Sequence, residues 1–185
     1  NANGLSGSID LTDELTRKEV KDDMRWFFTS GYSLQEMPIA VPSIMKMGEE
    51  YKNFFWDNLA RYSMWSRENI DLLADSHMVG NPTNGTVYGY ASWSPSKAIL
   101  GLRNPTDKEL TFQVNPKTVF DPASGTEQTW RFTEIDQLSS SFTASSAQPY
   151  TVTVPAFSVL VFEAQPVDVN LALNKKVTSS SVDTK

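Results

Sequence analysis

The sequence contains no cysteine and only one histidine, His77. Disulfide bonds, thiolate catalysis and cysteine-based zinc sites are therefore excluded, and one histidine cannot build a histidine-rich metal centre. The sequence also lacks a P-loop, a dinucleotide-binding glycine pattern, an HExxH motif and a GxSxG nucleophile elbow. We expect no metal and no cofactor. No apolar run approaches the length that spans a bilayer, so we expect no membrane span.

Positive charge is scarce as well. The 16 lysines and arginines are outnumbered by 22 acidic residues, and the net charge is −6. Binding to nucleic-acid phosphates needs clustered Lys and Arg, and no such cluster is present, so we expect no nucleic-acid partner. Hydrophobic residues make up 39% of the 185 positions, which is enough for one packed domain or two small ones.

The spacing of apolar residues predicts a helical first part. A first amphipathic helix follows Leu11, and a longer one runs over about 49–74 with a wide aromatic stripe. Pro38 and Pro42 predict a short extended segment followed by a loop over 32–47. Two helices and one extended segment cannot close a core. We therefore expect them to lean on the rest of the chain, on a second chain or on a missing region.

After Gly85 the apolar period changes to two, which predicts an antiparallel β-sandwich. Turn residues separate seven predicted strands, over 86–93, 98–103, 110–114, 118–120, 129–135, 150–154 and 158–163. The segment 138–148 is rich in Ser, Thr and Ala and predicts a loose loop. The predicted fold class is α+β, with a linker over 166–185.

Acidic residues are the first candidates for chemistry, because glycosidases use a pair of Asp or Glu side chains. Glu36 follows Gln35 in an apolar, extended stretch, where the end of a barrel strand would direct it into a pocket. The alternative is that Glu36 caps a loop or pairs with an arginine. Asp75 and His77 could form a buried polar pair after the long helix. A helix-terminal turn is the favoured interpretation there, and a lone histidine is more often a cap or a packed polar residue.

Tryptophans are the second group of candidates, since sugars stack on exposed aromatic rings. Trp93 lies at a strand end beside Ser94 and Pro95, where exposure is expected. Trp65 lies on the apolar face of the long helix and is expected in the core, whereas Trp56 is the better candidate for an interface. Aromatic residues dominate protein cores, so a packing role competes with sugar binding at each of these positions.

Two segments of the β part resemble the C-terminal β-sandwich of glycoside hydrolases built on a barrel. In 119–125, an aspartate is followed four residues later by glycine in a turn, and 152–162 carries a Val-Pro-Ala corner before a closing strand. The segments 65–77 and 79–93 resemble the last barrel helix of α-galactosidase-like enzymes and its exit into the sandwich. On this resemblance, 33–36 is the final barrel strand.

A further segment, 169–181, resembles the opening strand of a discoidin (factor 5/8 type C) module. The resemblances imply three parts: 1–82, the C-terminal part of a catalytic barrel; 83–165, an accessory β-sandwich; and 166–185, a linker with the discoidin strand. Asn1-Ala2 looks like a cloning scar and 177–181 lacks a closing element, so we expect both ends to be cuts in a longer protein.

The family resemblance implies a fragment of a secreted or periplasmic glycoside hydrolase that acts on oligosaccharides or polysaccharides. Such enzymes carry the nucleophile and the acid/base on earlier strands, so the fragment alone is expected to be inactive. Glu36 is the only catalytic candidate, and the sugar-binding candidates are Gln35, Trp93, Asp75 and His77. The alternatives are a carbohydrate-binding module and a protein-interaction adaptor whose aromatic helix docks on a partner. Self-association through the uncovered helix face is a further expectation.

Overall fold

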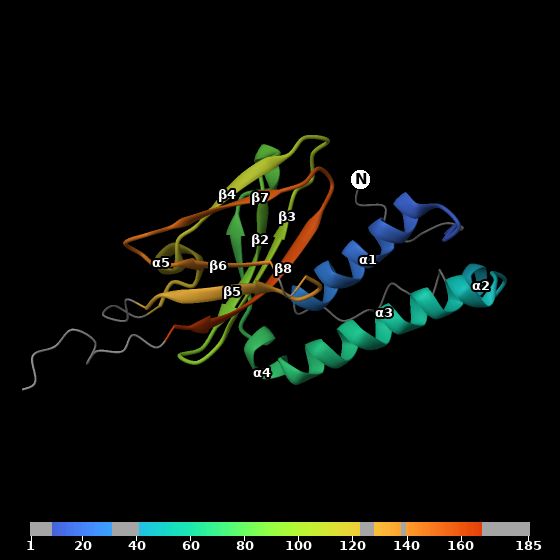
Figure 1. Ribbon diagram of the computed structural model, residues 1–185, viewed down its shortest axis with the longest axis horizontal. Coiled ribbons are helices and arrows are strands. Elements are labelled where there is room, and N and C mark those ends of the chain that lie inside the picture. The colour runs from blue at the N-terminus through green and yellow to red at the C-terminus, as the bar shows by residue number, and fades with distance from the viewer. Residues whose placement is uncertain (1–8, 31–40, 123–127, 138–139, 168–185) are drawn as a thin grey trace, which may run out of the picture.

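The computed structural model describes residues 9–30, 41–122, 128–137 and 140–167 (Figure 1). Helices precede a set of strands, so the predicted α+β class is confirmed. The helices are α1 (Glu14–Thr29), α2 (Val41–Ile44), α3 (Glu49–Glu68), α4 (Ile70–Leu73) and α5 (Pro116–Val119), with a 3-10 turn η2 (Pro82–Asn84). Among the described residues, no helix is long and apolar enough to cross a membrane.

The strands form two antiparallel sheets. They are β1 (His77–Gly80), β2 (Tyr88–Trp93), β3 (Ala98–Arg103), β4 (Leu110–Val114), β5 (Trp130–Glu134), β6 (Ser141–Ala144), β7 (Tyr150–Val154) and β8 (Val159–Pro166). The larger sheet has the order β1-β2-β3-β8-β5-β6, and β4 pairs with β7 in the smaller one. A core of aliphatic and aromatic side chains, including Leu100, Val114, Phe132 and Val154, fills the space between the sheets. This confirms the predicted antiparallel sandwich.

Three predicted strands, 98–103, 110–114 and 150–154, have the bounds of β3, β4 and β7. The strand predicted over 118–120 is wrong, because α5 occupies this segment. Asn115 caps α5 by accepting the backbone N–H of Lys117 at 3.0 Å, and Pro116 supplies a helical φ in the first turn.

The loose loop predicted over 138–148 is also wrong in part. Residues 141–144 form β6, which pairs with β5 so that Phe142 lies opposite Phe132. The two rings stack with centroids 4.7 Å apart. Contact with an aromatic core therefore overrides the polar composition of the segment. The strand β1 was not predicted either, although all four of its residues pair with β2.

The long helix predicted over 49–74 is interrupted at Asn69. The Asn69 backbone N–H donates to the carbonyl groups of Trp65 and Ser66, and α4 restarts at the next residue. The restart moves Ile70 off the predicted apolar stripe, and its side chain is 58% exposed. In the preceding segment, residues 41–44 form α2 instead of the predicted loop, because Pro42 lies in the first turn, where its missing N–H is tolerated. Residues 31–40 lie outside the described part.

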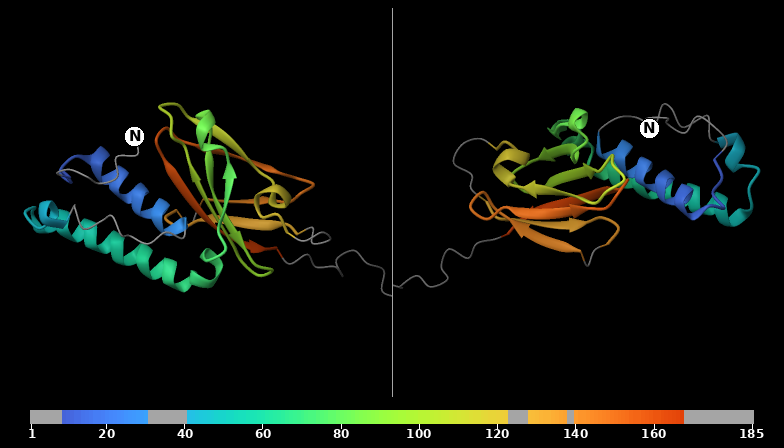
Figure 2. Two further views of the ribbon diagram at one scale, coloured as in Figure 1. Left: turned by 180° about the vertical axis from the view of Figure 1, so that it is seen from behind. Right: turned by 90° about the horizontal axis from the view of Figure 1, so that it is seen from above.

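The helices cover the outer face of the larger sheet (Figure 2). A second apolar cluster joins Leu73 of α4 to Ile99, Val159 and Val161 of the sheet, with Trp65 packed against it. The strand β3 is therefore buried on both faces. The side chains of α1 and α3 form a third cluster that includes Met24, Phe28, Phe55 and Tyr62. Of the three expected ways of covering the helices, packing against the β part is the one that the structure shows.

Candidate functional site

Charged side chains are buried where α1 and α3 meet the sheet. Arg25 of α1 is only 7% exposed and forms ion pairs with three carboxylates. Its guanidinium lies 3.3 Å from Asp22 Oδ1 and 3.5 Å from Asp136 Oδ2, and it is hydrogen bonded to Glu134. We call Asp22, Arg25, Glu134 and Asp136 the Arg25 cluster.

The turn after β5 holds Asp136 in this cluster. Glu134 Oε2 accepts the backbone N–H groups of Asp136 and Gln137 at 2.8 and 2.6 Å. Asp136 Oδ2 then accepts the hydroxyl of Tyr62 at 2.7 Å and lies 2.9 Å from Lys21 Nζ. Arg61 Nη2 approaches Asp136 Oδ1 to 3.0 Å.

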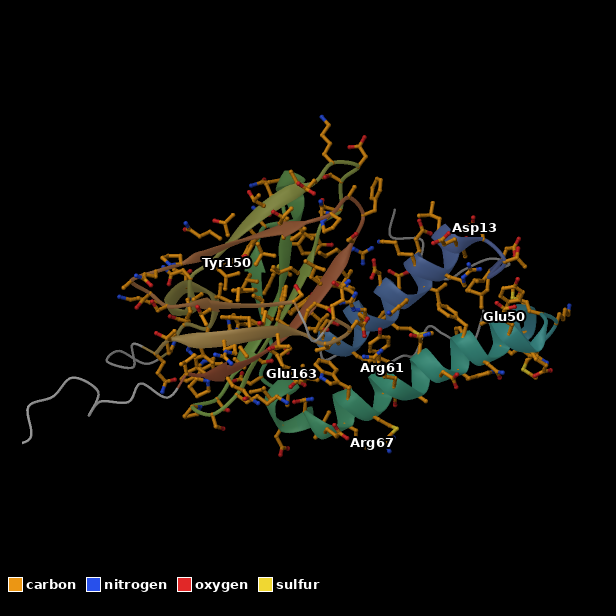
Figure 3. The ribbon with its side chains drawn as sticks, in the orientation of Figure 1. Asp13, Glu50, Arg61, Arg67, Tyr150 and Glu163 are labelled. Carbon is orange, nitrogen blue, oxygen red and sulfur yellow. The ribbon has the colours of Figure 1, made fainter. Side chains whose placement is uncertain are left out.

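Figure 3 shows Arg61 extending from α3 toward the sandwich. Each carboxylate of the Arg25 cluster faces a cation, so the cluster joins helices to sandwich.

Opposing effects act on the pKa of Asp136. Burial raises it, whereas the hydrogen bonds from Tyr62 and Lys21 and the charges of Arg25 and Lys21 lower it, and the net result is a pKa below the ordinary value of 3.8. Burial is also the largest effect on Asp23, where it raises the pKa against the opposing charge of Arg103. The two aspartates therefore bind protons in the folded state over different pH ranges.

This difference predicts the pH dependence of stability. Below about pH 4 the unfolded chain protonates Asp136 before the folded chain does, so the free energy of unfolding should fall as the pH is lowered through that range. Asp136→Asn should flatten this part of the curve. Asp23→Asn should steepen the rise of stability with pH just above pH 4, because the folded Asp23 takes up protons first there. Urea unfolding between pH 2.5 and 7 measures both, and equal slopes in all three proteins would contradict the assignment.

A shallow cavity of about 340 Å³ lies between the α3–α4 junction and the turn joining β2 to β3. We call it the α4 cavity. Its lining is mixed, with one aromatic ring, three carboxylates, one amide and one amine, from Glu68, Asn69, Asp71, Leu72, Asp75, Trp93, Ser94 and Lys97. It brings together two of the predicted sugar-binding residues, Trp93 and Asp75.

The walls of the α4 cavity are fixed by contacts with the fold. Trp93 is half-buried and packs against the sandwich core. In the β2–β3 turn, the Ser94 hydroxyl donates to the Lys97 carbonyl at 3.1 Å and accepts the Lys97 N–H at 3.2 Å. Lys97 Nζ lies 2.9 Å from a carboxylate oxygen of Glu163, whose other oxygen accepts the indole N–H of Trp65 at 2.6 Å.

Among the described residues, His77 is the predicted site residue that does not line the α4 cavity. The ring of His77 contacts the Val119 carbonyl, with Nε2 2.8 Å from the oxygen, whereas Asp75 is exposed. The buried pair between Asp75 and His77, the less favoured of the two interpretations, does not form, because β1 carries the His77 ring to α5. Asp75 lies in the turn after α4, as the favoured interpretation has it. Gln35 and Glu36 lie outside the described residues.

Sequence reasoning missed both the Arg25 cluster and Asn69. Asp22 and Arg25 lie three residues apart on α1, a spacing that a solvated helix face shows as readily as a buried ion pair. Their partners at 134 and 136 are more than 100 positions away, so no local pattern connects them.

The sequence matches no family model and no curated protein. Solved structures of glycoside hydrolases do resemble the fold. The α-galactosidase of Saccharomyces cerevisiae, solved with raffinose, has a TM-score of 0.58 at 10% identity, over 86% of this chain and 46% of that one. The α-galactosidase I of Mortierella vinacea has a TM-score of 0.54 at 11% identity, over 80% of this chain and 35% of that one.

The α-amylase of Geobacillus thermoleovorans, solved with acarbose, also has a TM-score of 0.54 at 11% identity, over 80% of this chain and 33% of that one. At such identities the likeness shows the fold alone. This chain has the helix-and-sandwich fold found in part of α-galactosidase and other glycoside hydrolase chains, and it spans less than half of their length.

Proposed function

We propose that this chain is the C-terminal region of a glycoside hydrolase. In this proposal the helices complete a (β/α) barrel, and the sandwich supports the barrel without supplying catalytic residues. The observation that carries it is the fold likeness to glycosidases that act on different sugars, over at least 80% of this chain. A part shared by an α-galactosidase and an α-amylase is better suited to support than to substrate choice.

The contacts between helices and sheet favour this supporting role. The Arg25 cluster and the apolar cluster around Ile99 fix α1, α3 and α4 against the sandwich. A rigid connection of this kind would hold the end of a barrel in place. The discoidin module and secretion stay predictions, since 168–185 lies outside the described residues.

The test compares this chain with the polypeptide encoded by its complete gene, using a panel of nitrophenyl glycosides. We expect hydrolysis by the complete polypeptide and none by this chain. Turnover by this chain, lost in Glu36→Gln, would contradict the supporting role. Lack of turnover by both proteins would contradict the glycosidase assignment.

The outer face of α3 carries exposed apolar side chains, from which we predict how the isolated chain associates. Trp56 and Met64 are 39% and 60% exposed, and Ala60 lies exposed between them at helical spacing. In our proposal the remainder of the barrel covers this face, so the isolated chain should self-associate through it. Light scattering should show a mass that rises with concentration.

Met64→Lys should abolish that rise, because it places a charge in the apolar stripe. Thr153→Lys, at an exposed polar position of β7 in the smaller sheet, is the matched control and should behave as the parent chain. A constant monomer mass for all three proteins would show that the face does not self-associate.

A further inference from the structure

We propose that the α4 cavity binds one hexopyranose unit that carries no negative charge, and that it binds a protonated amino sugar most tightly. The ligand class rests on the proposed function, whereas the position, the ring contact and the charge preference rest on the cavity itself. Its volume of about 340 Å³ lies at the lower end of the range for small-molecule sites, roughly 300–1,000 Å³. The cavity therefore suits a single unit and not a long segment of a polysaccharide.

Trp93 supplies the aromatic wall. Trp93 packs against the sandwich core and also lines the cavity. Among the described residues, the Trp93 indole N–H has no hydrogen-bond partner. Trp residues that are partly buried normally find such a partner, so this donor is available to a ligand hydroxyl or to water.

Asn69 supplies the hydrogen-bonding group at the base. Its side chain lines the cavity although the residue is only 5% exposed. The amide nitrogen donates to the Trp65 carbonyl at 2.8 Å, while Oδ1 has no partner in the part of the chain that the structure describes. Oδ1 is not fully buried, so it can accept a hydrogen bond from water or from a sugar hydroxyl in the cavity.

Charge decides which sugars fit. Glu68, Asp71 and Asp75 line the cavity and are exposed, with no ion pair to a described residue. The one cation in the lining, Lys97, is already paired with Glu163. The excess of negative charge repels uronic acids and attracts a protonated amine, which also gains from the face of an indole ring.

Three trisaccharides with matched sugar rings or lengths separate these contributions: the β-1,4-linked trimer of glucosamine, its N-acetylated counterpart and trigalacturonate. Titrations followed by ¹H–¹⁵N NMR report on the indole signal of Trp93, which is assigned by its loss in Trp93→Phe. We expect the signal to shift with the cationic trimer, to shift less with the neutral one and to stay in place with the anionic one. The preference for the cationic trimer should weaken in high salt.

The variants test each wall separately. Trp93→Ala should weaken binding of the cationic trimer about tenfold, which corresponds to about 1.4 kcal/mol, whereas Trp56→Ala, at an exposed tryptophan outside the cavity, should leave it unchanged. Asp75→Lys, at an exposed position that does not endanger folding, should abolish the preference for the cationic trimer over the neutral one.

Three results would overturn the proposal: no shift of the Trp93 signal with any trimer, binding of trigalacturonate as strong as that of the cationic trimer, or equal loss of binding in Trp56→Ala and Trp93→Ala. None of these depends on glycoside turnover, so failure here and failure of the proposed function remain distinguishable.

Discussion

Replacing Arg25 by methionine should lower the free energy of unfolding by about 3–5 kcal/mol, because it leaves the buried carboxylate of Glu134 without its cation and removes one of the cations that face Asp22 and Asp136. Arg25 faces Asp22, Glu134 and Asp136 at once, and its own side chain is only 8% exposed. Methionine retains much of the packing volume, so the loss reports the charge. Urea unfolding followed by circular dichroism at pH 7 measures it.

Two other arginines are matched controls. Arg61 also contacts Asp136, but its side chain is 52% exposed, so solvent screening should limit the cost of Arg61→Met to about 1 kcal/mol or less. Arg67, which Figure 3 labels on α3, is exposed and has no ion pair among the described residues. Arg67→Met should be close to neutral. Equal effects at all three positions would contradict a special role for the Arg25 cluster.

Removing the partners of Arg25 together with it gives a second measurement. The triple variant Arg25→Met, Glu134→Gln, Asp136→Asn removes the charge of Arg25 together with the charges of two of its carboxylate partners. Part of the stability lost in Arg25→Met should therefore return. This variant also keeps the test interpretable if Arg25→Met does not fold. A triple variant less stable than Arg25→Met would mean that packing and not charge governs the cluster.

The strands of the sandwich could be predicted from the sequence because their information is local. Around β3 and β7, apolar residues alternate or run continuously between clear turn residues, and tertiary contacts did not change the outcome. The failures at β6 and α5 have the opposite cause. Phe142 stacks on Phe132 within a Ser-rich segment, and a cap at Asn115 begins a short helix where a strand was predicted.

Of the residues in the α4 cavity, Trp93 could be predicted because it lies at a strand end, where exposure is expected. The position of Trp93 beside a turn indicated an accessible ring, and the structure places it in the α4 cavity with Asp75. Asn69 gives no such signal, since an asparagine within a long helical pattern is compatible with a surface position. Its place in the cavity follows from the interruption between α3 and α4, and Leu73 of α4 packs in one cluster with Ile99.

The helix α1 lies so close to β3 that a side chain added at Gly101 should lower the stability of the chain. A Cβ atom added at Gly101 would lie 2.5 Å from Thr29 Cγ2 and 3.1 Å from Thr29 Cβ, closer than packed carbon atoms allow. Gly101→Ala should therefore destabilise the chain by about 1–3 kcal/mol, the usual cost of overpacking. Gly48→Ala is the control, because its added Cβ would lie 3.9 Å from the nearest side-chain atom, Tyr51 Cδ2.

A compensating substitution at Thr29 shows whether this contact is the cause. Thr29→Ser removes Cγ2 and keeps the hydroxyl that donates to the Arg25 carbonyl. In the Gly101→Ala background, Thr29→Ser should restore most of the lost stability, whereas in the parent chain it should cost stability by opening a small space. Additive effects of the two substitutions would mean that α1 can shift away from the added Cβ atom at little cost. A strong coupling would establish that α1 is held rigidly on the sheet, as the proposed support of a barrel requires.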